Sequence, residues 1–318
     1  MPPCAELQLL PPAIVLTGPT AAGKTAAAFA LADAFDVHLV SADSSQVYRG
    51  MDIGTAKPSR AELERYPHAL IDIRDPARPY NAAEFAADAE REIHVARARG
   101  QIPVIVGGTP LYLRALRYGL DPLPPADPAL RAEIEHEAAR SGWPAVHARL
   151  AALDPDSARR IAPDDPQRIQ RALEICLLSG RPASVQRSGR GVDRMAGALH
   201  LVMAPGDRGC LHARIAERTD RMLAEGLIDE TRALFARPDL GPDSTALRAV
   251  GYRQAGQLLA GQFDRAELAA RIRAATRQLA KRQLTALRQW TGALWYDPLK
   301  SDLPDRILER VRRWLAGA

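Results

Sequence analysis

The chain has 318 residues, of which 47% are hydrophobic and 25% charged, with a net charge of +5 at pH 7. This length and composition exclude a disordered or fibrous chain and allow one large globular domain or two smaller ones. The excess of positive charge favours a polyanionic partner.

The cysteines and the first 20 residues indicate which cellular compartment to expect for the protein. Cys4, Cys176 and Cys210 are scattered, so we expect reduced thiols and no zinc site. The start of the chain lacks the basic segment of a signal peptide, and no apolar run is long enough to span a bilayer. We therefore expect a cytoplasmic protein with no membrane partner.

The most informative segment lies at residues 18–25 and reads GPTAAGKT. An apolar run at 13–16 precedes it and an alanine-rich stretch at 26–34 follows, which is the strand–loop–helix context of a phosphate-binding loop. Glycines let successive N–H groups face one anion, and the helix adds the positive end of its dipole. A chance glycine-rich turn would not require the strand, the spacing and the Lys-Thr pair together. The pattern predicts a di- or triphosphate site, with Lys24 on the phosphates and Thr25 on Mg²⁺.

A second candidate site follows the strand expected at 38–42. Asp43 there lies beside the phosphate loop if the strands are parallel, because their carboxyl ends share one crevice. It could hold Mg²⁺ through water or act as a general base, or Asp43 and Ser44 could simply cap the next helix. The segment at 51–58, MDIGTAKP, is too particular for a generic turn, but its spacing assigns it no task.

Further strands are expected at 70–73 and 103–107, with a helix at 82–99 between them. Alternating strands and helices predict a parallel α/β sheet with crossover helices. The last of these strands ends in Gly107 and Gly108, which would place Thr109 near the same crevice. A tight strand-to-helix turn would explain the glycines equally well.

The texture changes after residue 120. The proline-rich run at 121–128 cannot lie in a continuous helix, whereas 129 to about 180 looks helical, with breaks at Gly142 and at 163–166. After an expected loop at 184–196, further strands are expected at 199–204 and 293–296. We predict an α/β core of residues 1–120 and 197–318 that carries a helical insertion domain, 121–196. A separate C-terminal domain is the alternative, and the strand after the helices counts against it.

Basic residues gather in several segments. Residues 167–171 open a helix, 248–253 place two arginines and an aromatic around a glycine, and 271–288 contain six basic residues and no acidic one. Because Arg273, Arg277 and Lys281 are four apart, they share a helix face, which is either solvated or bound to a phosphate backbone. Tyr252 and Trp290 could stack on bases or pack in the core. Arg214 and Arg218 could grip a diphosphate or form ion pairs.

Seven strings together resemble the bacterial tRNA dimethylallyltransferases, also called tRNA isopentenyltransferases, over nearly the full length. They are GPTAAGKT, SADSSQVYRGMDIGTAKP, DIRDP, VGGTPLYLRAL, DDPQRIQRALEI, RAVGYRQ and ATRQLAKRQLTALR. The resemblance implies a P-loop NTPase-like sheet with a helical insertion. It also implies transfer of a dimethylallyl group from dimethylallyl diphosphate to N6 of the adenosine immediately 3′ of the anticodon, in tRNAs that read codons beginning with U.

The resemblance also implies roles for single residues. Asp43 would take the N6 proton, Thr20 would orient the reacting groups, and Arg218, supported by Arg214, would grip the leaving group. The diphosphate, with Mg²⁺ at Thr25, would be held by Gly18, Pro19, Thr20, Ala21, Ala22, Gly23, Lys24, Thr25, Arg214 and Arg218.

The same resemblance implies a tRNA-binding set, with the insertion clamping the anticodon stem-loop. Its members are Asp43, Ser44, Ser45, Gln46, Thr109, Arg131, Gln167, Arg168, Ile169, Gln170, Arg171, Arg248, Gly251, Tyr252, Arg253, Lys281, Arg282, Gln283 and Arg288. No C-terminal zinc-finger cysteines are found, as in the bacterial type, and nothing in the sequence requires more than a monomer.

Three other functions remain open. A P-loop kinase for a small metabolite would keep Lys24, Thr25 and Asp43 but has no use for the basic helix or the insertion. An adenylate isopentenyltransferase would share the isoprenoid site and lack the strings that contact tRNA. A non-enzymatic RNA-binding module would not need the phosphate loop, Asp43 and the arginine pair together.

Overall fold

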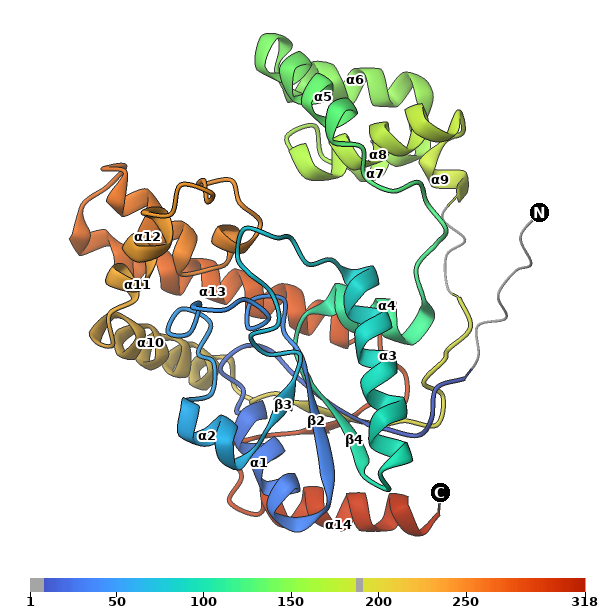
Figure 1. Ribbon diagram of the computed structural model, residues 1–318, viewed down its shortest axis with the longest axis vertical. Coiled ribbons are helices and arrows are strands. Elements are labelled where there is room, and N and C mark those ends of the chain that lie inside the picture. Colours follow the sequence, from blue (N-terminus) through green and yellow to red (C-terminus); the bar gives the residue numbers. More distant parts are fainter. Residues whose placement is uncertain (1–8, 187–190, 318) are drawn as a thin grey trace. The chain divides into compact units, whose positions relative to one another are not determined.

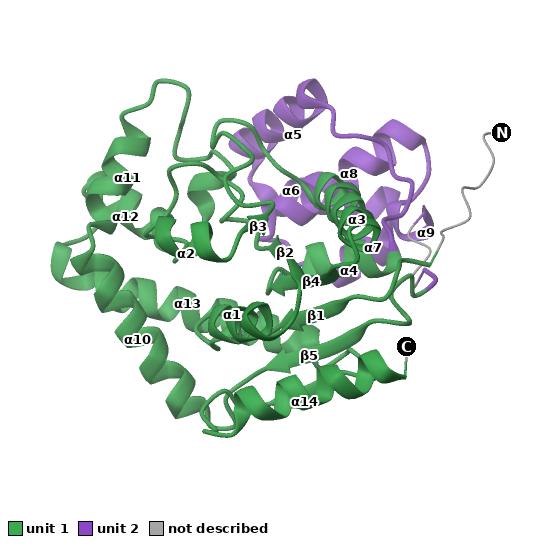
Figure 2. Ribbon diagram, turned by 60° about the horizontal axis from the view of Figure 1, so that its bottom comes forward, with its two compact units in different colours: residues 1–118, 193–318 green, residues 119–192 purple. Residues whose placement is uncertain are grey.

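A computed structural model describes residues 9–186 and 191–317, so Cys4 lies outside the described residues. The chain divides into two compact units, which are coloured separately in Figure 2. Residues 1–118 and 193–318 form the first, called the core unit below, and residues 119–192 form the second, called the helical unit.

The core unit is built on one sheet of six parallel strands in the order β3-β2-β4-β1-β5-β6. The sheet confirms the predicted α/β class. The central strand β1 pairs with β4 on one side and β5 on the other, so that Ile14 lies beside both Val104 and Leu199. The strands are β1 (Ile14–Thr17), β2 (Val37–Ala42), β3 (His68–Ala69), β4 (Ile102–Gly107), β5 (Leu199–Met203) and β6 (Leu294–Tyr296).

Helices cover both faces of this sheet, because alternate side chains of each buried strand point to opposite faces. Ile14 and Leu16 pack toward α1 and α14, whereas Ala13 and Val15 belong to the larger cluster with α3 and α4. The core-unit helices, most of them labelled in Figure 1, are α1 (Lys24–Ala34), α2 (Arg60–Arg65), α3 (Ala82–Ala98), α4 (Pro110–Tyr118), α10 (Arg208–Ala224), α11 (Leu227–Phe235), η1 (Ala246–Arg248), α12 (Tyr252–Leu259), α13 (Arg265–Leu287) and α14 (Leu303–Ala316).

One expected strand was misplaced. We predicted it at 70–73, but β3 ends at Ala69. Leu70 and Asp72 have positive φ angles, 66° and 56°, which no strand residue adopts. The apolar side chains of Leu70 and Ile71 are nevertheless buried, which is why the segment resembled a strand.

The helical unit has a hydrophobic core of its own, formed by residues such as Ile134, Leu150 and Leu173. Its helices are α5 (Pro128–Ser141), α6 (Trp143–Leu153), α7 (Pro155–Arg160), α8 (Pro166–Ser179) and α9 (Ala183–Gln186). The break at Gly142 occurs as expected. The break at Asp154 was missed, although Asp before Pro is a typical helix start: its side chain accepts from Ser157 N and is fully buried.

Hydrogen bonds join the point at which the chain leaves the core unit to the point at which it returns. Arg117, at the end of α4, donates from Nε and Nη2 to Oδ2 of Asp193, at 3.0 and 2.6 Å. Arg194 N donates to the carbonyl of Arg117 at 2.8 Å. The two ends of the core that flank residues 119–192 are therefore bound directly to each other.

Candidate active site

The phosphate loop follows β1 and depends on two glycines. A Cβ on Gly18 would lie 2.1 Å from the carbonyl oxygen of Met203, so β5 leaves no room for a side chain there. Gly23 is the N-cap of α1 and has a φ angle of 81°, in the left-handed region that favours glycine. The loop thus turns sharply against the sheet and leads into the N-terminus of α1, where the positive end of the helix dipole lies.

Lys24, the first residue of α1, folds back over this loop. Its Nζ donates to the carbonyls of Gly18 and Pro19 at 3.0 and 2.8 Å. Burial lowers the pKa of Lys24 to about 8; the nearby Asp43 carboxylate acts in the opposite direction, and the Arg218 guanidinium lowers it further. An anion beside Lys24 would raise its pKa again and so favour the charged form, which suits a phosphate site.

Asp43 follows β2, next to β4 in the sheet. Its Oδ1 accepts from the backbone N–H groups of Ser45 and Gln46, at 2.8 and 3.4 Å, so it stabilises a turn and not the start of a helix. No hydrogen bond to Oδ2 is found within the described residues. Thr109, after β4, accepts from Ser44 N at 3.0 Å and so ties the two strand ends together. One carboxylate oxygen therefore fixes the turn and leaves the other for chemistry.

Two arginines reach the same region from α10. Arg214 Nε donates to the carbonyl of Ala21 in the phosphate loop at 2.8 Å, and Arg218 Nη2 donates to the carbonyl of Thr55 at 3.1 Å. Burial lowers the pKa of Arg218, and Asp43 partly offsets that effect. Neither arginine forms an ion pair within the described residues, so the alternative of ion pairing is not observed there.

Gln283 on α13 connects the ends of two strands. Its Oε1 accepts from Thr20 N at 2.9 Å and its Nε2 donates to the carbonyl of Gly108 at 2.8 Å. The residue is only 7% exposed. We expected Gln283 to contact tRNA, but in the structure its side-chain amide is hydrogen-bonded to the phosphate loop and to Gly108.

These groups surround one cavity of about 1440 Å³ within the core unit. Its walls come from the carboxyl ends of β1, β2 and β4, from the segment 52–58 and from α10 and α13. The side chains that carry the proposed chemistry all lie on it: Thr20, Lys24, Thr25, Asp43, Thr109, Arg214 and Arg218. The sequence prediction therefore named residues that the fold brings together.

Oxygen ligands of a type suited to a divalent cation line the cavity. They include the hydroxyl of Thr25, which is exposed, and the carboxylate of Asp43. Among residues 9–186 and 191–317 no cluster of three His, Cys, Asp or Glu side chains could hold a metal ion. Mg²⁺ typically keeps several waters and binds through one or two protein groups plus phosphate oxygens, so this donor set fits a phosphate-bound Mg²⁺.

Only some of the basic side chains of α13 lack an ion pair within the described residues. Arg271 pairs with Glu267 of the same helix at 2.9 Å, and Arg273 pairs with Asp220 of α10. The absence of acidic residues in the sequence of this stretch was therefore misleading for these two. The other basic side chains of the helix are exposed and form no ion pair in the described part of the chain; they are Arg265, Arg277, Lys281, Arg282 and, at its C-terminal cap, Arg288.

The segment 248–253 needs a correction. Tyr252 is fully buried and donates to Oε1 of Glu230 at 2.5 Å, so its ring has no face for a base. Trp290 packs against His200 and Arg117, which is the core role that had been left open. Arg248 and Arg253 are exposed, Gly251 is buried, and Arg248 to Gly251 line the cavity.

The helical unit also departs from expectation. Ile169 is fully buried and cannot contact a ligand through its side chain. Arg131 and Arg171 both bind Glu174, whose side chain is completely buried, at 2.8 and 2.5 Å. Although burial alone would raise the pKa of Glu174, the two arginines hold it below its usual value. They stabilise the helical unit, whereas Gln167 and Arg168 at the start of α8 are exposed.

Three residues that hold the site or the helical unit together were not singled out from the sequence: Lys57, Glu174 and Glu230. Each has an ionisable side chain whose functional group is largely enclosed. The residues next to a charged residue in the sequence do not reveal whether it is buried or exposed. Lys57 and Glu174 did lie within strings that resemble the family, which was the available signal. Glu230 lies outside all of those strings.

Comparison with known proteins agrees with the geometry. Residues 46–290 match the model of the family described as IPP transferase. The chain belongs to this family. A tRNA dimethylallyltransferase of Bordetella petrii is 56% identical over 310 residues, which cover 96% of this chain and 98% of that protein. One from Paracidovorax citrulli is 51% identical over 333 residues, covering all of this chain and 93% of the relative.

Solved structures of the family show the same fold. A tRNA isopentenylpyrophosphate transferase from Bacillus halodurans is 33% identical, with a TM-score of 0.69 and coverage of 96% of both chains. A eukaryotic dimethylallyltransferase at 23% identity shares the fold with a TM-score of 0.76, over 96% of this chain and 79% of that one. Within residues 9–186 and 191–317, no helix of this family member is long and apolar enough to cross a bilayer.

Proposed function

We propose that this chain transfers a dimethylallyl group from dimethylallyl diphosphate to N6 of the adenosine immediately 3′ of the tRNA anticodon, in tRNAs that read codons beginning with U, and releases diphosphate. The observation that carries the proposal is the single cavity in which the phosphate loop, Arg214, Arg218 and Asp43 meet. Membership of the IPP transferase family supports the same reaction.

The reaction forms one bond and breaks another. The N6 lone pair attacks the C1 carbon of the dimethylallyl group, the C1–O bond breaks, and its electron pair leaves on the diphosphate. Asp43 accepts the N6 proton through the carboxylate oxygen that the turn does not use. Thr20, in the phosphate loop, lies where it can orient the reacting groups.

Positive groups stabilise the charge that develops on the departing diphosphate. Lys24, Arg214, Arg218 and the backbone N–H groups of Lys24 and Thr25 at the start of α1 supply them, and all belong to the core unit. Thr25 would hold Mg²⁺, which when bound would neutralise further charge on the diphosphate.

Binding of tRNA depends on exposed cations and on a flipped base. Lys281, Arg282, Arg288, Arg248 and Arg253 provide phosphate contacts on the core unit, with Ser44, Ser45 and Thr109 at the cavity near the base. Gln167 and Arg168 provide contacts on the helical unit, which we propose clamps the anticodon stem-loop. Extrusion of the adenosine costs a few kcal/mol, which contacts in the cavity must offset.

The proposed enzyme acts as a monomer in the cytoplasm, the compartment in which tRNA is modified.

A labelling experiment tests the proposal. The purified protein is incubated with Mg²⁺, radiolabelled dimethylallyl diphosphate and an anticodon stem-loop that carries adenosines within and after the anticodon. We expect label only at the adenosine 3′ of the anticodon. Transfer to free adenylate without transfer to RNA would assign the chain to the adenylate enzymes. Hydrolysis of ATP with no transfer would favour a kinase and contradict the proposal.

A further inference from the structure

The segment 51–58 is the one conspicuous sequence string with no assigned task, and it forms part of the cavity wall. Backbone N–H groups of this segment donate hydrogen bonds to one carboxylate, that of Glu230 on α11. Oε2 of Glu230 accepts from the amides of Asp52 and Ile53, both at 2.9 Å, and Oε1 accepts from Gly54 N at 3.1 Å. Three consecutive N–H groups thus bind a single side chain.

A fourth bond joins this carboxylate to another part of the site. The Tyr252 hydroxyl donates to Oε1 of Glu230 at 2.5 Å. Packing around the tyrosine is tight, since a Cβ on Gly54 would lie 2.4 Å from the Tyr252 ring. Glu230 therefore connects the loop 51–58 with the segment 248–253 that carries Arg248 and Arg253.

The other end of the loop is fixed by Lys57, whose side chain is only 2% exposed. Its Nζ contacts the carboxylates of Asp52 and Asp72, each at 2.5 Å, and donates to the carbonyl of Tyr48 at 2.9 Å. Held at both ends, the loop has little freedom to move, and its carbonyls are fixed in direction.

One of those carbonyls acts on the cavity. Thr55 O accepts from Nη2 of Arg218 at 3.1 Å and from Nε2 of Gln46 at 3.5 Å. A guanidinium on a long side chain otherwise has several rotamers, and a fixed acceptor restricts them before an anion arrives.

We infer that Glu230 is a positioning residue for the diphosphate grip: by holding the loop 51–58, it directs the Thr55 carbonyl that orients Arg218. The inference rests on the proposed function only in taking Arg218 as a diphosphate contact. Glu230 itself does not line the cavity.

Glu230→Gln tests this with little change in shape. The glutamine amide keeps one acceptor oxygen, but its NH₂ group is a donor and would face backbone N–H groups, which are donors too. It therefore cannot hold the loop as the carboxylate does. We expect binding of dimethylallyl diphosphate, measured by calorimetry without tRNA, to weaken about 10-fold, while Arg218→Ala weakens it about 50-fold through lost charged hydrogen bonds. In the Arg218→Ala background, Glu230→Gln should add less than a twofold loss, because residues that act as a unit are not additive.

The same cycle contains the outcome that would overturn the inference. If the loss of affinity in the double variant equals the product of the losses in Glu230→Gln and Arg218→Ala, then Glu230 acts on the fold in general and not through Arg218. Tyr252→Phe is the milder second variant, because it removes one of the four hydrogen bonds; we expect a two- to threefold loss that again disappears when Arg218 is alanine. It keeps the test decisive if Glu230→Gln does not fold.

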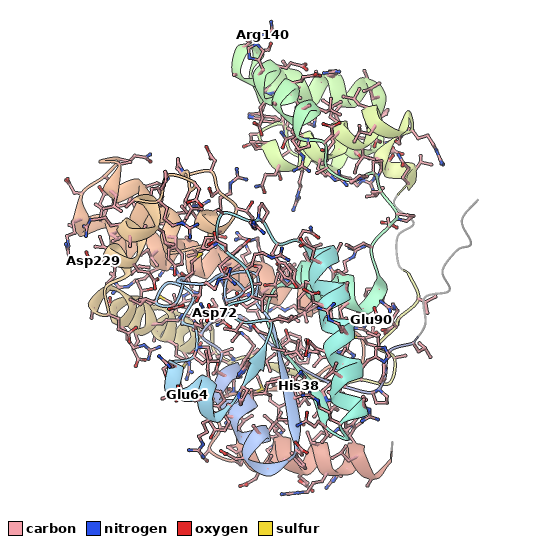
Figure 3. All side chains as sticks on the ribbon, viewed as in Figure 1. His38, Glu64, Asp72, Glu90, Arg140 and Asp229 are labelled. Atoms are coloured by element: carbon pink, nitrogen blue, oxygen red, sulfur yellow. The ribbon has the colours of Figure 1, made fainter. Side chains whose placement is uncertain are left out.

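A matched control lies next in the sequence. Asp229, labelled at the edge of the core unit in Figure 3, is exposed and pairs only with Arg232 among the described residues. Asp229→Asn removes the same charge and should leave the affinity unchanged; a loss equal to that of Glu230→Gln would contradict the inference. These binding measurements do not require transfer to tRNA, so a failed labelling experiment and a failed cycle are distinguishable.

Discussion

At the scale of single residues, Asp43 can serve both as the capping residue of a turn and as a general base; the sequence presented capping and base catalysis as alternatives. Its Oδ1 caps the turn after β2, and its Oδ2 forms no hydrogen bond within the described part of the chain. A carboxylate is symmetric in its two oxygens, whereas an amide keeps only one acceptor. The two tasks can therefore be separated by substitution.

Asp43→Asn should retain the turn and lose the base. We expect the rate of dimethylallyl transfer to fall about 10²–10⁴-fold, the usual contribution of general base catalysis. Binding of tRNA, measured by filter retention, should stay within about twofold. Asp43→Ala removes the cap as well, so a larger loss of stability in alanine than in asparagine is the control. Weak tRNA binding by the asparagine variant would make Asp43 a docking residue.

The lowered pKa of Lys24 predicts a pH dependence. Below a pKa of about 8 the ammonium is charged and attracts the diphosphate; above it the free protein must take up a proton to bind. Affinity for dimethylallyl diphosphate should therefore be constant near pH 7 and fall toward pH 9.5 by up to tenfold per unit.

Lys24→Arg is the control for that profile, since a guanidinium stays protonated throughout. Its affinity should be lower but independent of pH between 7 and 9.5. If the wild-type affinity is also constant, or if the arginine variant retains the alkaline decline, then another group controls binding.

At the scale of elements, α13 has two functions on two faces. Gln283 reaches inward to the phosphate loop, while its sequence neighbours Lys281 and Arg282 are exposed. The helix thus links the surface proposed for tRNA to the loop proposed to hold the diphosphate.

Lys281→Glu should weaken tRNA binding and reduce its dependence on salt, since one phosphate contact contributes a slope of about 0.7–0.9 to the logarithmic salt plot. Arg265→Glu is the matched control. It makes the same charge change at the other end of α13, about 24 Å away, where an acidic residue also suits the helix N-terminus. Equal effects of the two variants would indicate general electrostatics without a specific contact.

The elements also show what sequence could predict. The phosphate loop, β1, β2 and β4 were foreseen because their signals are local: a glycine pattern and short apolar runs. Burial of Tyr252 and Ile169 was not, because it depends on packing between segments far apart in the chain. The pairing of Arg131 and Arg171 with Glu174 was missed for the same reason, and a surface charge and a buried ion pair look alike in sequence.

At the scale of the whole molecule, the core unit completes its cavity without the helical unit. Replacing residues 119–192 by a short Gly-Ser linker should leave a core that unfolds cooperatively and binds dimethylallyl diphosphate within about threefold of the full chain. The stem-loop affinity should fall at least tenfold, since the clamp proposed on Gln167 and Arg168 is lost. Loss of diphosphate binding in a folded deletion variant would show that the helical unit completes the site. Unchanged stem-loop affinity would contradict the clamp.

The bond between Arg117 and Asp193 has a mechanical consequence. A load applied to residues 119–192 reaches the core through two chain crossings, and at that point each crossing is bound to the other by a buried guanidinium and a backbone hydrogen bond. Force is therefore shared across this lock before it reaches β4 or β5.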